Sequence, residues 1–185
     1  MTEQKIPSIA RMRKRHTPKQ AVTAQPGAGR RLVEAQSFRD ALIASLIVIV
    51  LFSVIWAMLS TLSNRIWPWM TMLLGIFLGL AIRRAGRGLD WRFPVLAAAA
   101  TLVGALGSNV VVAAAFTARA METTTLAVLR AVTAMTWPVF FEEAMTPADL
   151  AYALIGAGIA AFFANRRLNR AEYLAYRRWR DGRDS

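Results

Sequence analysis

Four long uncharged stretches dominate the pattern of apolar and polar residues along the chain. An α-helix rises about 1.5 Å per residue, so roughly 20 apolar residues in helical form are needed to cross the ~30 Å hydrocarbon core of a membrane. The pattern therefore predicts an all-α, polytopic membrane protein with four transmembrane helices. These spans are expected at about 41–62, 66–82, 93–118 and 147–164.

The second and fourth spans carry residues that favour helix initiation. The segment 67–69 reads Trp-Pro-Trp. Proline fits the first helical turn, where its missing N–H has no partner, and tryptophan favours the headgroup level. Thr146, Pro147 and Asp149 have the spacing of N-cap, N1 and N3 residues. The fourth span has the shortest uncharged run, 150–164, so a buried helix of a soluble domain is its alternative interpretation.

The segment between the third and fourth spans, 119–146, is about 28 residues long. Helices in bundles are usually joined by roughly two to eight residues. We expect this segment to form an amphipathic helix that either lies on the outer membrane surface or re-enters the membrane, and Trp137–Pro138 to interrupt it. Its apolar positions at helical spacing are Leu126, Leu129, Val132 and Met135.

The basic residues are distributed unevenly around the predicted spans. The net charge is +12, and 20 of the 23 Lys and Arg residues lie before the first span, in the second loop or after the fourth span. Because Lys and Arg concentrate in cytoplasmic segments, this distribution predicts four crossings with both termini in the cytoplasm. Without the fourth span, the arginines that follow it would lie outside. The three exceptions are Arg65, Arg119 and Arg130.

Composition narrows the class of protein. The chain is 56% hydrophobic and contains no Cys, which excludes disorder throughout, disulfide scaffolds and thiolate sites. Arg greatly outnumbers Lys and Ala is abundant, as in GC-rich bacterial genomes, so we expect a bacterial inner (plasma) membrane. The first apolar run begins about 40 residues into the chain and is too long for a cleaved signal peptide. An Arg-rich mitochondrial presequence over 1–40 is the alternative.

Residues 1–29 are basic, polar and interrupted by three prolines, which predicts a disordered cytoplasmic tail. Such a tail is attracted to the anionic inner leaflet, so membrane lipids with anionic headgroups are expected partners. Nucleic-acid binding is the alternative interpretation of its basic cluster. The residues expected to contact anionic headgroups are Arg11, Arg13, Lys14, Arg15, Arg83, Arg84, Arg166 and Arg167.

The C-terminal segment, 166–185, is expected to continue the fourth helix into the cytoplasm as a basic helix and tail. Tyr173, Tyr176 and Trp179 recur in it at a spacing of three, with arginines between them. One interpretation is an interfacial helix along the headgroups. The other is a docking face for a partner subunit.

Few residues in the predicted spans have side chains suited to catalysis or to binding a metal or cofactor. None of the uncharged stretches contains Asp, Glu, His, Lys or Arg, and the single His16 lies in the N-terminal tail. No phosphate loop, dinucleotide-binding fingerprint or zinc motif is present, so we expect no catalytic, cofactor or metal residues. Asn109, with Thr101 nearby, is expected to form an interhelical hydrogen bond, or alternatively to line a pore.

Three acidic residues, Glu142, Glu143 and Asp149, lie close together before and within the start of the fourth span. They are expected to be solvated charges near a helix N-terminus, where the helix dipole stabilises them. A weak divalent-cation site or partner site is the alternative.

Small residues recur four apart in three spans, which lets helix backbones approach closely. The fourth span has two such stripes side by side, 156/160/164 and 153/157/161, which favours oligomerisation or a partner span beyond one packed neighbour. The positions expected to mediate helix packing are Gly75, Gly79, Gly104, Ser108, Gly156 and Ala160.

One stretch also carries a resemblance. Residues 75–92, GIFLGLAIRRAGRGLDWR, followed by an Ala/Gly-rich span and by PADL at 147–150, resemble small, uncharacterised bacterial four-span membrane proteins over about 70–165. The resemblance implies four spans and bacterial origin, and it implies no activity. The long basic N-terminal tail and the long third loop are not typical of that group.

The sequence therefore favours a non-enzymatic membrane protein that serves as an accessory, assembly or scaffold subunit of a membrane complex, assembled with other membrane subunits or with itself. The first alternative is a small oligomeric channel or transporter with Asn109 and Thr101 along its path. The second is a membrane-anchored binder of acidic partners or nucleic acid that uses the basic N-terminal tail.

Overall fold

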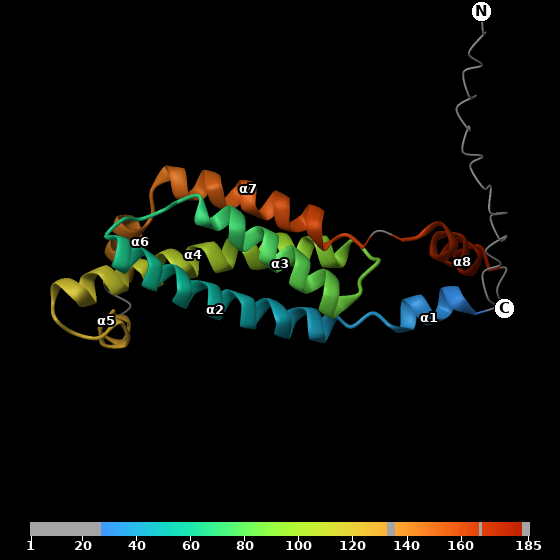
Figure 1. Cartoon of the computed structure of the whole chain (residues 1–185), viewed down its shortest axis with the longest axis horizontal. Coiled ribbons are helices and arrows are strands. Elements are labelled where there is room, and N and C mark those ends of the chain that lie inside the picture. Colours follow the sequence, from blue (N-terminus) through green and yellow to red (C-terminus); the bar gives the residue numbers. More distant parts are fainter. Residues whose placement is uncertain (1–26, 133–135, 167, 183–185) are drawn as a thin grey trace, which may run out of the picture.

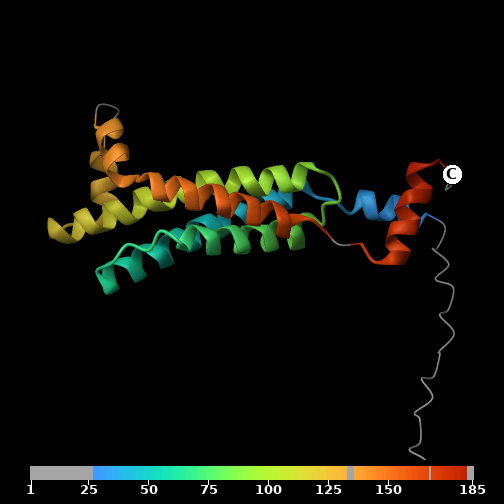
Figure 2. The same ribbon diagram turned by 90° about the horizontal axis from the view of Figure 1, so that it is seen from above.

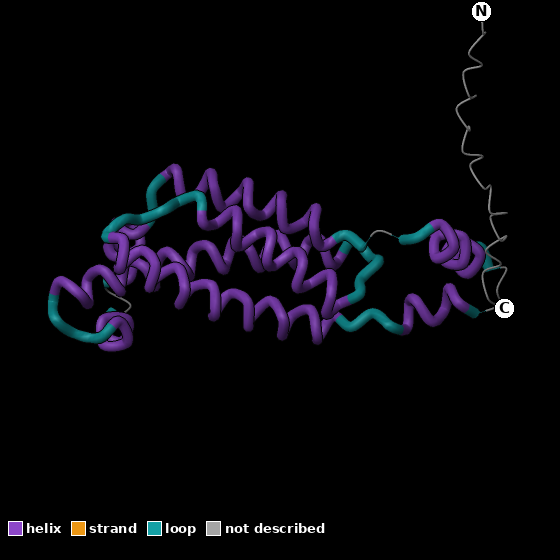
Figure 3. The backbone as a smooth tube through the Cα atoms, viewed as in Figure 1, coloured by secondary structure: helices purple, strands orange, loops and turns teal. Residues whose placement is uncertain are grey.

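The computed structural model describes residues 27–132, 136–166 and 168–182, and within these ranges it contains helices and loops but no strand (Figures 1 and 3). This confirms the all-α class. The helices are α1 (Ala28–Glu34), α2 (Phe38–Ser63), α3 (Met70–Gly86), α4 (Arg92–Ala120), α5 (Thr125–Ala131), α6 (Trp137–Ala144), α7 (Pro147–Ala164) and α8 (Arg170–Arg180).

Four helices form an elongated bundle, and each successive one returns along the bundle axis (Figure 1). α3 and α4 lie at its centre, since each contacts the other and both α2 and α7, whereas α2 and α7 do not contact each other within the described chain. We call the end that carries α1 and α8 the α8 end, and the opposite end the α5–α6 end. α2, α4 and α7 are long and apolar enough to cross a membrane.

The bundle buries many small and polar side chains together with a few large ones, and it exposes most of the large apolar side chains of α2. On α2, Ser45, Ser53 and Ser60 are buried, while Leu46 is 63% exposed and lies on a broad apolar surface of Leu, Ile, Val and Met side chains. Contiguous apolar surface of this kind is rare on monomeric soluble proteins. The distribution agrees with a helix bundle whose outer surface contacts lipid.

The closest helix contact joins α3 and α7, which run parallel because both start at the α5–α6 end. A Cβ added to Gly75 would collide with the carbonyl oxygen of Gly156, and one added to Gly79 would lie 2.6 Å from that of Ala160. Glycine at these positions therefore permits direct contact between the two backbones.

α4 fills the space between α2 and α7. Gly104 faces Ile49 of α2, and the buried Ser53 and Ser108 hydroxyls lie 2.7 Å apart in a hydrogen bond between α2 and α4. On its other side, α4 packs Ala105 in one buried cluster with Ala153 of α7. Both small-residue stripes of the predicted fourth span thus contribute buried residues to contacts within one chain.

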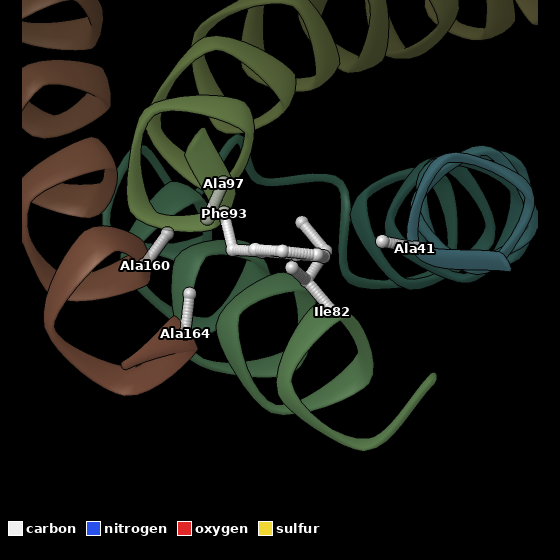
Figure 4. Packing of buried hydrophobic residues seen from close by; sticks show 6 residues of the cluster. All are labelled: Ala41, Ile82, Phe93, Ala97, Ala160 and Ala164. Atoms are coloured by element: carbon white, nitrogen blue, oxygen red, sulfur yellow. The ribbon is translucent and has the colours of Figure 1, made fainter. Parts of the chain in front are cut away.

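A second buried cluster closes the bundle at the α8 end (Figure 4). The Phe93 side chain reaches from α4 towards Ile82 of α3 and Ala41 of α2, with Ala160 and Ala164 of α7 on the other side. Four helices therefore meet around one aromatic ring.

The second span is displaced from its predicted position. The expected helix at 66–82 is instead Met70–Gly86, so the prediction that Pro68 occupies the first turn of the α-helix is wrong. The amides of residues 70, 71 and 72 each bond to the carbonyl three residues earlier, so residues 67–69 form a tight turn that precedes the helix. At the other end, Arg83 and Arg84 lie in the last helical turn.

The third loop contains two short helices in place of one. α5 and α6 each contact α4 and no other described helix, and Trp137–Pro138 starts α6, because proline is tolerated at its first positions. Leu126, Leu129 and Val132 lie in or next to α5, while Met135 falls outside the described residues.

The expectation that residues 166–180 continue the fourth helix is wrong. α7 ends at Ala164, Asn165 has an extended backbone, and α8 begins at Arg170 (Figure 2). The cause is a new helix start: the Asn169 and Glu172 side chains form a capping box. The predicted start of the fourth span is confirmed, since Thr146 and Asp149 form a capping box with Pro147 at N1.

The α3–α7 contact predicts a sharp difference between two glycines on α7. A Cβ on Gly156 would lie 2.7 Å from the Thr71 carbonyl oxygen, whereas one on Gly158 meets nothing within 4 Å. We expect Gly156→Ala to lower the free energy of unfolding by about 1–3 kcal/mol, and Gly158→Ala to leave it unchanged or raise it slightly. Thermal unfolding in detergent, followed by circular dichroism, measures both. Equal stability of the two variants would contradict this contact.

Candidate functional site

α1 and α8 come from opposite ends of the sequence and pack against each other beyond the bundle (Figures 1 and 2). A Cβ on Gly29 would lie 2.5 Å from the Ala175 carbonyl oxygen and 2.6 Å from Cβ of Trp179, so the two helices touch through a glycine. We call this element the α1–α8 pair. It is a second packed unit, joined to the bundle by two short segments.

Local chemistry explains why α8 is a separate helix. The Asn169 amide donates to Glu172, and the Arg166 guanidinium forms an ion pair with the same carboxylate at 3.0 Å. The Glu172 carboxylate therefore caps the N-terminus of α8 and also binds Arg166 in the segment that precedes the helix. Arginines occupy the last turn, where the negative end of the helix dipole favours positive charge.

Two hydrogen bonds attach the segment after α1 to the bundle. The Ser37 amide donates to the Gly86 carbonyl at 3.0 Å, and the Leu89 amide donates to the Gln36 side chain at 3.1 Å. The chain between α1 and α2 is thereby held against the end of α3 and the loop that follows it. The position of α1 is set by these contacts as well as by α8.

The α8 end gathers basic residues from three distant parts of the sequence. Carboxylates offset only part of this charge: Glu34 accepts a hydrogen bond from Arg30 at 2.6 Å, and Asp181 lies 3.9 Å from Arg177. The bond and charge of Glu34 raise the pKa of Arg30 above its usual value. The described arginines of this end are Arg30, Arg31, Arg39, Arg83, Arg84, Arg87, Arg92, Arg166, Arg170, Arg177, Arg178 and Arg180.

Aromatic side chains accompany these arginines. On α8, a hollow of about 230 Å³ is lined by Tyr173, Tyr176, Arg177 and Arg180, which recur at helical spacing along one face. Exposed aromatic rings combined with guanidinium groups are typical of protein interaction surfaces. The α1–α8 pair is therefore the candidate site that the described residues support best.

The two polar residues singled out in the predicted third span are both buried within the bundle. Thr101 is fully buried and donates to the Ala97 carbonyl of its own helix at 2.7 Å. Asn109 is 5% exposed, and its amide nitrogen lies 3.6 Å from the Met145 sulfur. The Thr101 bond thus stays within α4, whereas Asn109 contacts the segment that precedes α7.

The acidic residues do not converge in the described structure. Asp149 uses one carboxylate oxygen as a helix cap, accepting from the Thr146 amide at 2.9 Å and hydroxyl at 2.6 Å. Glu142 is exposed on α6, and the Glu143 side chain lies outside what the structure describes. Within the described residues, no group of three or more His, Asp and Glu could hold a metal ion.

Only some of the residues expected to contact lipid headgroups lie in the described part of the chain. Arg11, Arg13, Lys14, Arg15 and Arg167 lie outside the described residues, while Arg83 and Arg84 end α3 at the α8 end. Arg166 is partly covered and paired with Glu172. The α1–α8 pair was not among the expected elements, although the spacing of Asn169 and Glu172 is a recognisable helix start.

Comparison of the chain with protein-family models, curated proteins and solved structures gave no match.

The Gly29 contact predicts that the α1–α8 pair can be separated without unfolding the bundle. In Gly29→Leu the new side chain would collide with the α8 backbone, so we expect faster amide hydrogen exchange throughout α1 and α8 and unchanged exchange in α3 and α7. Ala35→Leu, an exposed position at the end of α1, is the matched control. Unchanged protection of α8 in Gly29→Leu would show that the pair does not depend on this contact.

Proposed function

We propose that the protein is a four-span integral protein of the bacterial inner membrane with both termini in the cytoplasm. The 17 residues of α3 span about 25 Å at 1.5 Å per residue, near the lower limit for a membrane helix. α3, the second of the four in chain order, completes the set of spans, since it lies inside the bundle and contacts all three helices that are long enough to cross.

The distribution of charge and aromatic residues supports this orientation. Arginines concentrate at the α8 end, and the described residues of the opposite end contribute Arg65, Arg119 and Arg130. The positive-inside rule then assigns the α8 end to the cytoplasm. At the opposite end, α6 exposes Trp137 and Val139, as expected for a helix lying at the membrane interface.

We further propose that the protein is a non-enzymatic accessory or scaffold subunit of a membrane complex, and that its partner binds the α1–α8 pair through an acidic surface. The observation that carries this proposal is the pair itself. It packs by its own glycine contact outside the bundle and presents arginines and aromatic rings to the surroundings. Residues 1–26, which precede α1 in the sequence, carry a further excess of basic residues.

The proposed orientation predicts opposite accessibility for two engineered cysteines, which are clean reporters because the chain has no Cys of its own. Met121→Cys, in the turn after α4, should react with a membrane-impermeant thiol reagent in intact cells. Asp90→Cys, in the loop between α3 and α4, should react only after permeabilisation. Both residues are exposed, so burial does not limit either reaction. Labelling of both from the same side would contradict the four-span arrangement.

The proposed subunit role predicts a stable complex that depends on α8. After gentle extraction from native membranes, native mass spectrometry should show the chain with another protein in fixed ratio. Charge reversal in the double variant Arg177→Glu, Arg180→Glu should release that partner, because both residues line the α8 hollow. The control Arg130→Glu changes an exposed arginine at the opposite end. Recovery of the unmodified chain alone, or as a symmetric oligomer, would refute the role.

A further inference from the structure

A groove lies on the side of the bundle at the α5–α6 end. The C-terminal ends of the α2 and α4 ribbons diverge there (Figure 2). Its volume is about 570 Å³, within the roughly 300–1,000 Å³ range of ligand pockets. The residues that line it come from α2, α4 and the turn that leads into α5. We call it the α2–α4 groove.

The floor of the groove is made of small side chains and its walls of large apolar ones. Ala57, Ala115 and Ala118 are nearly covered by neighbouring residues, whereas Val54 and Met58 are at least half exposed. The walls belong to the apolar surface that α2 presents outward along its length. The groove therefore opens sideways, towards the lipid that would surround the bundle.

The outer rim of the groove is polar. Arg119, Thr123 and Thr125 line it together with Thr61 of α2. The Arg119 guanidinium donates to the Thr61 backbone carbonyl, which fixes its position over the groove. A guanidinium has five N–H donors, and among the described residues no carboxylate lies within ion-pair distance of this one.

The groove thus combines apolar walls with one guanidinium that has no carboxylate partner among the described residues. This combination suits an amphiphilic ligand, which carries both an apolar chain and an anionic group. Arg119 is the second-to-last residue of α4, so in a spanning helix it stands where the hydrocarbon gives way to the headgroups. A water-soluble ligand would leave the apolar walls unfilled, and an apolar partner helix would leave the guanidinium without an anion. A phospholipid satisfies both parts, with an acyl chain along the alanine floor and a phosphate at Arg119.

We propose that the α2–α4 groove binds one anionic phospholipid of the outer leaflet, whose acyl chain lies over Ala57 and Ala115 and whose headgroup phosphate accepts hydrogen bonds from Arg119. The proposal rests on membrane insertion in the orientation described above. It differs from the general attraction of anionic lipid to the α8 end, because it requires one bound lipid at the opposite end of the molecule.

Arg119 also has a purely structural use, since it caps a carbonyl near the C-terminus of α2. Arg119→Gln separates the two roles. Glutamine retains an N–H donor for the Thr61 carbonyl but lacks the positive charge. Arg130→Gln is the matched control, because it removes an exposed arginine of α5 at the same end that does not line the groove.

The test is a titration of the full chain, purified and delipidated in detergent, with phosphatidylglycerol and with phosphatidylcholine, read by native mass spectrometry. We expect one phosphatidylglycerol to bind more tightly than phosphatidylcholine. Arg119→Gln should weaken that binding by about tenfold or more, the effect of losing hydrogen bonds to a charged group. Arg130→Gln should leave it unchanged.

A second pair of variants tests the apolar part of the site. Ala115→Phe would fill the floor, and Val54→Phe would enlarge a wall at an exposed position that the bundle does not need for packing. Both should weaken phosphatidylglycerol binding, whereas Val103→Phe, an exposed position of α4 outside the groove lining, should not. Circular dichroism and thermal unfolding confirm that each variant remains folded.

Three results would overturn the proposal. The first is equal affinity for the two lipids, and the second is equal weakening by Arg119→Gln and Arg130→Gln. The third is a lipid-free dimer that Val54→Phe abolishes, which would assign the groove to a second copy of the chain.

A separate test distinguishes failure of the groove site from failure of membrane insertion. Extraction of the protein by alkaline carbonate would refute membrane insertion. Resistance to carbonate with lipid binding insensitive to the groove variants would refute the groove site alone.

Discussion

The backbone contact between α3 and α7 is the constraint on which the bundle depends. α7 contacts only α3 and α4 among the bundle helices, and it reaches α3 through Gly75 and Gly156, where no side chain separates the two backbones. In lipid, association of helices relies on such close packing, because lipid tails are as apolar as the side chains they replace. The position of α7 then fixes where α4 can lie, since α4 packs alanines against it.

Close packing of this kind accounts for the many small residues in the interior. The buried interior combines many alanine, glycine and serine residues with a few large apolar side chains such as Trp56, Leu74 and Ile82, whereas most large apolar side chains of α2 face outward. Buried hydroxyls then need partners inside the protein, and the Ser53–Ser108 bond supplies one between α2 and α4. Phe93 is one of the large buried side chains and lies where four helices converge at the α8 end.

Much of this arrangement was predictable from the sequence, because lipid exposure and helix capping leave local signals. The bounds of α2, α4 and α7 follow from hydropathy and from the cap at Thr146 and Asp149. The start of α3 was not predictable, since hydropathy cannot distinguish a tight turn at 67–69 from a first helical turn. The α1–α8 pair was also missed, because it depends on contact between residues about 150 positions apart, Gly29 and Ala175.

The α1–α8 pair connects parts of the bundle that have no direct contact. α1 precedes α2 and α8 follows α7, and α2 and α7 lie on opposite sides of α3 and α4 without touching within the described chain. The contact between Gly29 and Ala175 brings together chain segments that adjoin the two outer helices. A partner that binds across both α1 and α8 would stabilise the contact between them by mass action. That stabilisation would add to the packing at Gly75 and Gly156, which holds α7 against α3 at a different level of the molecule.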